Sequence, residues 1–168
     1  MQLSEIMVDR VITVYAGATV KEAVNLMNKY GIGCLVVQEK MKPIGILTER
    51  DLMKRVLAKS KKPEEIIVRD VMSTPLVAGS RELEIESALR VMLERGIKKL
   101  PIIEKGSLIG IVSLTDLISS QPDVIGTVKE IAAKEYTPKR IKKVAEYYVG
   151  LPTQPLLADY TPIKKLRQ

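Results

Sequence analysis

The chain of 168 residues is long enough for one ordinary domain, or for a compact pair of half-sized repeats with an appendage. It has no His and one cysteine, Cys34, which excludes zinc-finger spacings, His-based catalytic triads and an internal disulfide. The net charge of +7 favours contact with polyanions in general. No apolar run reaches the roughly 18–20 residues that span a bilayer, and residues 1–8 do not resemble a signal peptide, so we expect a cytoplasmic protein with no membrane contact.

One sequence pattern occurs twice. A shift of 65 residues superimposes residues 7–52 on residues 72–117 without a gap, and thirteen of the 46 pairs are identical. The identical pairs include Met7/Met72, Gly31/Gly96, Gly45/Gly110 and Asp51/Asp116. Chance does not place Gly, Met and Asp together in one register. A single unit of about 50 residues buries too little apolar surface to be stable alone, so the two copies are expected to pack as a pseudo-twofold pair.

Each copy is expected to contain a helix, two strands joined by a turn, and a second helix. Thr19 and Glu22 predict a capping box at the start of the first helix, and Gly31 is expected to end it. In the first copy the elements are expected at residues 19–30, 35–37, 44–47 and 49–58, with the turn at 40–43. In the second copy they are expected at residues 83–95, 100–103, 108–112 and from about 114, with the turn at 105–107.

The last part of the chain differs in composition. Residues 121–168 hold nine basic and five acidic residues, and a helix is expected at 127–134 and another from Thr137 to about Val149. Four of the six tyrosines also lie here, so a nucleic-acid contact through residues 136–168 is one interpretation. The other is an amphipathic helix that packs on the repeats or across a dimer. We therefore divide the chain into 1–62, the first repeat with its connector, 63–121, the second repeat, and 122–168, a basic helical extension.

A Thr/Ser-x-x-Asp motif stands in each copy where a strand is expected to give way to a helix. The two motifs run from Thr48 to Asp51 and from Ser113 to Asp116. The hydroxyl can contact a phosphate, and the carboxylate one turn later can accept hydrogen bonds from both ribose hydroxyls. The same residues would also serve as ordinary helix caps. The residue chemistry alone leaves both interpretations open.

The duplicated order of elements resembles a pair of cystathionine-β-synthase-type (CBS) repeats, called a Bateman module, over about residues 5–120. The resemblance is carried by a Gly-Ile pair after the first helix, a Gly-Ile-Leu/Val strand and the Thr/Ser-x-x-Asp motif. These stand at Gly31-Ile32, Gly45-Ile46-Leu47, Gly96-Ile97 and Gly110-Ile111-Val112. It implies an α/β fold of two β-α-β-β-α repeats, here as a stand-alone pair with a basic C-terminal extension.

The resemblance also implies a function. Such a pair is expected to bind an adenosine ligand (AMP, ADP, ATP or S-adenosylmethionine) between its repeats and to act as a regulatory sensor, with no catalytic residue, metal or required cofactor. CBS pairs commonly associate, so we expect a homodimer. The alternative is a nucleic-acid-binding protein in which the CBS pair is a scaffold or regulator for residues 136–168.

Two ligand sites are implied. One would hold ribose and phosphate at Ser113, Thr115 and Asp116, with adenine against Val11, Ile12, Gly33 and Cys34. The mirrored site would use Thr48, Arg50 and Asp51 with Met72, Leu76 and the backbone near Lys99. Nucleotide-binding relatives carry a basic pair for phosphate where this chain has Lys98 and Lys99, although a solvated turn is the alternative there. We therefore expect tighter binding at Asp116, and we expect Cys34 to be a small buried residue or pocket wall and not a reactive thiol.

Overall fold

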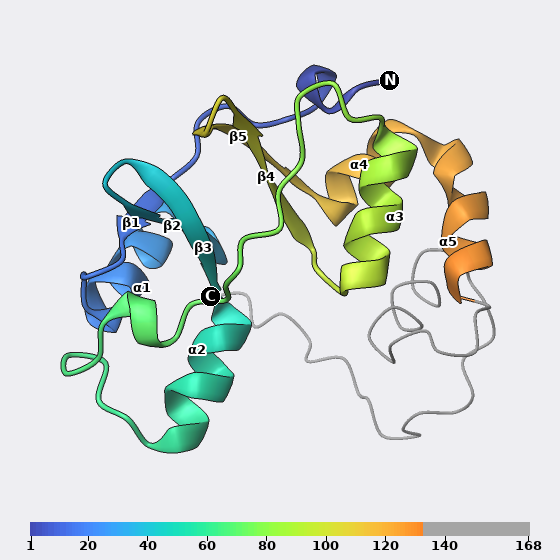
Figure 1. The fold of residues 1–168 in the computed structure, drawn as a ribbon. Helices are drawn as coiled ribbons and strands as arrows, with labels where there is room; N and C mark the ends of the chain where they lie inside the picture. The colour runs from blue at the N-terminus through green and yellow to red at the C-terminus, as the bar shows by residue number, and fades with distance from the viewer. Residues whose placement is uncertain (133–168) are drawn as a thin grey trace, which may run out of the picture.

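The computed structural model describes residues 1–132 (Figure 1). Its elements recur at a constant interval in the sequence. The first repeat contains η1 (Leu3–Glu5), β1 (Thr13–Tyr15), α1 (Val20–Tyr30), β2 (Cys34–Glu39), β3 (Lys42–Thr48) and α2 (Glu49–Arg55). The second contains η3 (Val68–Asp70), α3 (Ile85–Arg95), β4 (Lys99–Glu104), β5 (Ser107–Ser113) and α4 (Leu114–Ser120). Every matched boundary differs by the predicted 65 residues, so the tandem α/β repeat is confirmed. The turns η2 (Leu57–Lys59) and η4 (Pro122–Val124) and the helix α5 (Ile125–Ala132) complete the described chain.

Local sequence sets the ends of α1. The Thr19 hydroxyl accepts a hydrogen bond from the Glu22 N–H at 3.2 Å, and the Glu22 carboxylate accepts one from the Thr19 N–H at 2.6 Å, which confirms the predicted capping box. Gly31 ends the helix with φ of 63°, a left-handed conformation that glycine adopts without steric cost. Gly96 ends α3 in the same way.

Helix α3 begins two residues later than predicted. The backbone at Leu83 and Glu84 pairs instead with the N-terminus of the chain, where the Leu3 N–H donates to the Leu83 carbonyl at 2.9 Å. Glu84 also provides no side-chain cap, so no local signal marks the helix start. The prediction of a start at residue 83 is therefore wrong, because an interaction with a distant segment keeps these residues extended.

Each repeat contains a tight antiparallel hairpin. Strands β2 and β3 pair from Cys34 opposite Thr48, and β4 and β5 pair from Lys99 opposite Ser113. Both turns have two central residues with positive φ, as two-residue hairpins of the right twist require. These residues are Lys40, Met41, Lys105 and Gly106. The turns are thus shorter, and the strands longer, than predicted.

The segment that leads into each repeat packs against the other repeat. Val8 pairs with Ile111 of β5 in the second repeat, and Ser73 pairs with Ile46 of β3 in the first. Leu3 is fully buried in the core of the second repeat. The equivalent segment, 68–73, supplies two buried valines to the core of the first repeat. Each repeat is therefore completed by a segment that precedes the other repeat. The domain boundaries drawn from the sequence stay a prediction.

Two glycines allow this close approach. A Cβ atom on Gly110 would lie 2.6 Å from the sulfur of Met7, and one on Gly45 would lie 2.9 Å from the carbonyl oxygen of Ser73. Both distances are shorter than van der Waals contact, and at Gly45 the atom is a backbone oxygen, so glycine is needed there, whereas the Met7 side chain could move away from a Cβ at Gly110. Strands β3 and β5 also lie against each other between the repeats.

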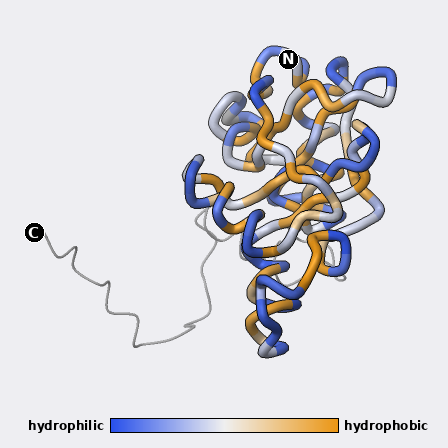
Figure 2. Tube along the Cα trace, turned by 90° about the vertical axis from the view of Figure 1, so that its left-hand side faces the viewer, coloured by the Kyte–Doolittle hydropathy of each residue, from blue (hydrophilic) through white to orange (hydrophobic). Residues whose placement is uncertain are grey.

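Each repeat has its own aliphatic core, and the hydrophobic segments gather inside the body while loops are hydrophilic (Figure 2). Helix α5 packs against α3. Val128 of α5 and Val124 of η4 join the second core, and the Thr127 hydroxyl donates to the Glu86 carboxylate at 3.0 Å. The helix predicted at 127–134 is therefore confirmed within the described residues, where it runs from 125 to 132. None of the described helices is long and apolar enough to cross a bilayer. The helix predicted from Thr137 and the rest of the segment 136–168 lie outside the described residues.

Candidate functional site

The Thr/Ser-x-x-Asp motif of the second repeat lies at the junction of β5 and α4. The Ser113 hydroxyl donates to Oδ2 of Asp116 at 2.6 Å, and the Ser113 N–H donates to the same oxygen at 2.8 Å. The hydroxyl in turn accepts the Asp116 N–H at 3.1 Å. Lys99 pairs with Ser113 across the hairpin, and the carbonyl of Lys98 accepts a hydrogen bond from the Leu114 N–H at 3.0 Å. We call Lys98–Lys99 with Ser113–Asp116 the second junction.

The first repeat repeats this geometry. The Thr48 hydroxyl and N–H donate to Oδ2 of Asp51 at 2.7 and 2.9 Å, and the hydroxyl accepts the Asp51 N–H at 3.3 Å. Cys34 pairs with Thr48, and the carbonyl of Gly33 accepts a hydrogen bond from the Glu49 N–H at 3.1 Å. We call Gly33–Cys34 with Thr48–Asp51 the first junction.

Both motifs are therefore helix caps, as one of the two interpretations predicted. Capping occupies only one carboxylate oxygen in each copy, Oδ2, because the N-cap N–H and hydroxyl converge on it. A carboxylate oxygen accepts hydrogen bonds through two lone pairs. Each aspartate thus retains Oδ1 for another role, and the cap does not exclude a ligand.

The two Oδ1 atoms have different surroundings. Oδ1 of Asp51 accepts a hydrogen bond from the Ser73 hydroxyl at 2.9 Å and lies 3.5 Å from Nη1 of Arg55. Among the residues from 1 to 132, Oδ1 of Asp116 has no hydrogen bond or ion pair. Asp51 is buried, and Asp116 is only half-buried. The second junction is the one with an open carboxylate oxygen.

The two junctions influence each other across the interface between the repeats. Burial raises the pKa of the Cys34 thiol, the positive charge of Lys99 opposes this shift, and the negative charge of Glu49 adds to it. Lys99 belongs to the second repeat. Because its charge acts on Cys34, it lies within electrostatic reach of the first junction. The Glu49 carboxylate covers Gly33 closely: a Cβ atom there would lie 2.8 Å from Oε2.

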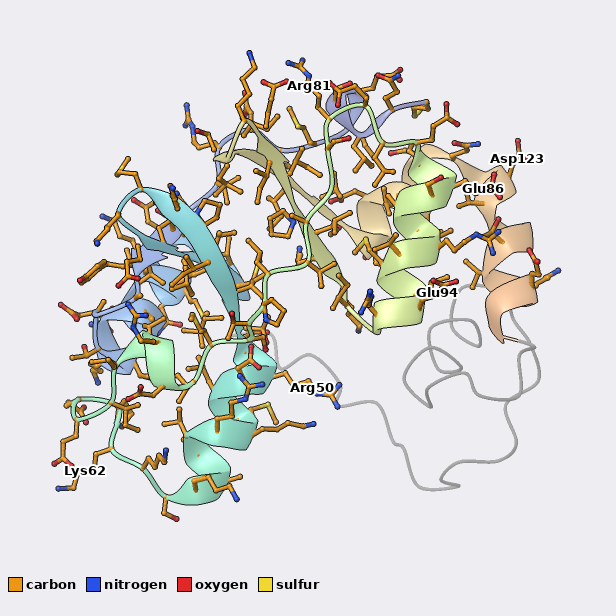
Figure 3. All side chains as sticks on the ribbon, viewed as in Figure 1. Arg50, Lys62, Arg81, Glu86, Glu94 and Asp123 are labelled. Atoms are coloured by element: carbon orange, nitrogen blue, oxygen red, sulfur yellow. The ribbon has the colours of Figure 1, made fainter. Side chains whose placement is uncertain are left out.

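The structure assigns the other predicted residues to three places. Met72 packs against the first core and lies beside Asp51, because its carbonyl oxygen accepts a hydrogen bond from Arg55. Arg50 is exposed and projects outward from the start of α2 (Figure 3). The remaining residues lie in connecting segments or on the surface: Val11, Ile12 and Leu76 are half-buried, and Thr115 is exposed.

Three residues at the junctions were not predicted: Ser73, Arg55 and Glu49. Ser73 is 22 residues from Asp51 in sequence, so no local pattern connects them. Arg55 follows Asp51 at the i, i+4 spacing of a helical ion pair, a signal that was available in the sequence. Within the described part of the chain, no group of three or more Cys, Asp or Glu side chains is placed to hold a metal ion.

The two junctions, each formed by a hairpin end and a capped helix and related by a constant interval, define a tandem CBS pair. The chain belongs to the CBS domain family, whose model matches residues 3–58 and 68–123. These two ranges also differ by 65 residues, in agreement with the structural repeat. CBS pairs are regulatory modules in this family.

Relatives with this pair occur in several contexts. The chain is 40% identical over 122 residues to an uncharacterized protein of Methanopyrus kandleri, a match that covers 70% of this chain and 62% of that protein. It is 35% identical over 119 residues to the CBS domain-containing protein YhcV of Bacillus subtilis, covering 71% and 84%. It is 39% identical over 116 residues to the inosine-5'-monophosphate dehydrogenase of Methanocaldococcus jannaschii, covering 68% of this chain but 22% of the enzyme.

Solved structures agree with this assignment. A conserved CBS domain protein of unknown function from Thermoplasma acidophilum superimposes with a TM-score of 0.68 at 28% identity, over 81% of this chain and 79% of that one. A hexameric CBS-CP12 protein from bloom-forming cyanobacteria gives a TM-score of 0.67 at 29% identity, over 89% and 94%.

Proposed function

We propose that this protein is a non-catalytic regulatory module that binds an adenosine ligand at the second junction. Ribose would bind at Asp116, and phosphate at Ser113, at Lys98 and at Lys99, the first residue of β4. AMP, ADP, ATP and S-adenosylmethionine all carry the ribose that this site recognises. The observation that carries the proposal is the open Oδ1 of Asp116 at the junction where Lys99 pairs with Ser113 and the Lys98 carbonyl accepts the Leu114 N–H.

The chemistry of the second junction fits such a ligand. An ionised carboxylate only accepts hydrogen bonds, and a ribose presents two hydroxyl donors, so the open Oδ1 is a suitable acceptor. Lys98 and Lys99 are both exposed and supply positive charge for a phosphate. The described structure contains no ion pair that engages either lysine, so their charges remain available.

The first repeat would supply the surface for adenine. Gly33 has no side chain and Cys34 is half-buried, and Lys99 of the second repeat lies within electrostatic reach of that cysteine. A ligand that contacts both repeats binds one arrangement of them better than another, and it shifts the population accordingly. This difference is the physical basis of the proposed regulation.

The test is calorimetric titration of the full chain with AMP, ADP, ATP and S-adenosylmethionine. We expect Asp116→Asn to weaken binding by at least about tenfold, since a hydrogen bond to a charged group is worth about 1.5–3 kcal/mol. Asp51→Asn is the matched control, because it alters the equivalent cap in the first repeat. Equal affinity of wild type and Asp116→Asn for every ligand would exclude this site.

We also propose a homodimer in the cytoplasm. Met53 of α2 and Leu57 of η2 are 63% and 68% exposed, which leaves apolar surface for a second copy. In the second repeat the residue equivalent to Met53, Ile118, is buried. Light scattering of wild type and of Met53→Ser with Leu57→Ser tests this assembly: a dimer that persists unchanged in the double variant would exclude this surface.

A further inference from the structure

Both oxygens of the Asp51 carboxylate are engaged by other residues of the chain. Its Oδ2 accepts both donors of Thr48, and its Oδ1 accepts the Ser73 hydroxyl at 2.9 Å and faces the Arg55 guanidinium at 3.5 Å. Three hydrogen bonds and one ion pair therefore engage the two oxygens, so a ligand donor must compete with Ser73 and Arg55 for Oδ1.

Arg55 is held in this position by the backbone. Its Nη1 donates to the carbonyl oxygen of Val71 at 2.8 Å and to that of Met72. The same short segment continues to Ser73, whose hydroxyl binds Asp51. The end of α2 and the segment 71–73 are thus joined through one cluster that includes the aspartate.

The second repeat provides an internal comparison. At the 65-residue interval, the counterpart of Ser73 is Val8, which has no hydroxyl, and the counterpart of Arg55 is Ser120, which has no charge. The counterpart of Asp51 is Asp116, whose Oδ1 has no hydrogen bond among the described residues. The same fold therefore presents one occupied and one open carboxylate.

We infer that Ser73 and Arg55 form an internal latch that closes the first junction to nucleotides, so that each chain binds one ligand and not two. This inference rests on the proposed function of the second junction. A ribose that approaches Asp51 must first displace the Ser73 hydroxyl and the Arg55 charge. Because a hydrogen bond to a charged group is worth about tenfold or more in an equilibrium constant, binding at Asp51 is weaker by at least that factor.

The test replaces Ser73 and Arg55 by the residues that stand at the equivalent positions of the second repeat. Ser73→Val with Arg55→Ser gives the first junction the side chains that stand at the equivalent positions of the second. Stoichiometry and affinity for AMP are measured by calorimetry on the full chain, in the wild-type background and with Asp116→Asn. We expect one AMP per wild-type chain, two per unlatched chain, and one per unlatched chain that carries Asp116→Asn.

A milder pair, Ser73→Ala with Arg55→Gln, guards against loss of folding, because Gln retains a donor for one of the backbone carbonyls. Circular dichroism and thermal melting establish that each variant is folded. If either folded pair binds two AMP molecules, the latch is supported.

The outcomes separate the two proposals. Two AMP molecules per wild-type chain, or one per chain in every folded unlatched variant, would overturn the latch and leave nucleotide binding intact. Binding by the unlatched variant alone would support the latch and overturn the assignment of the native site to Asp116. No binding of AMP by any variant, together with no binding of ADP, ATP or S-adenosylmethionine in the same titrations, would overturn both.

Discussion

Replacement of Leu3 by alanine tests whether the N-terminal segment belongs to the core of the second repeat. Leu3 is fully buried there, 0% exposed, and its N–H donates to the Leu83 carbonyl at 2.9 Å. Truncation of a fully buried leucine to alanine costs about 2.7–5 kcal/mol of stability, since it removes apolar burial and leaves a cavity. For a chain of this size each 1 kcal/mol lowers the Tm by about 2–4 °C, so we expect a loss of about 5 °C or more.

The control is Met1→Ala, two residues away on a side chain that is 52% exposed, which we expect to change the Tm by less than about 2 °C. Thermal melting by circular dichroism measures both variants, and hydrogen exchange locates the effect. Exchange in Leu3→Ala is expected to rise in β4 and β5 more than in β2 and β3, because the lost contacts lie in the second core. A Tm equal to that of Met1→Ala, or faster exchange confined to the first repeat, would refute the reasoning.

Two further predictions concern the first repeat. Because burial raises the pKa of the Cys34 thiol and Lys99 opposes the shift, alkylation of Cys34 should be slow at pH 7 and accelerate with rising pH. Lys99→Met removes the opposing charge and raises the pKa of the Cys34 thiol further. Alkylation of Cys34 at pH 8 should therefore be slower in Lys99→Met than in wild type and in the control Lys98→Met. Unchanged alkylation rates would contradict this electrostatic coupling. Gly45→Ala should destabilise the protein by about 1–3 kcal/mol in urea titrations, because the added methyl group meets a backbone carbonyl at 2.9 Å. Gly126→Ala in α5, where a Cβ meets nothing within 4 Å, should instead be neutral or stabilising, and an equal effect of both substitutions would argue against the close packing at Gly45.

Much of the architecture follows from local sequence. The 65-residue repeat, the capping box at Thr19, the helix end at Gly31 and the hairpins were all predicted, because caps, turns and strand patterns depend on residues within a few positions of one another. The cap at each Thr/Ser-x-x-Asp motif was one of the two interpretations that the sequence left open, and the structure shows it in both repeats. The ligand and its contacts stay predictions, since they depend on a molecule outside the chain.

What the sequence determined by itself is the repeated unit, its register and its local caps, together with the family to which the pair belongs. The tertiary structure alone decided that Leu3 packs in the second core, that α3 begins late, and that Ser73 meets Asp51 while Asp116 keeps an open oxygen. The physical reason is that the segment preceding each repeat packs against the other repeat. Their partners lie far away in sequence, and only the path of the folded chain brings them together.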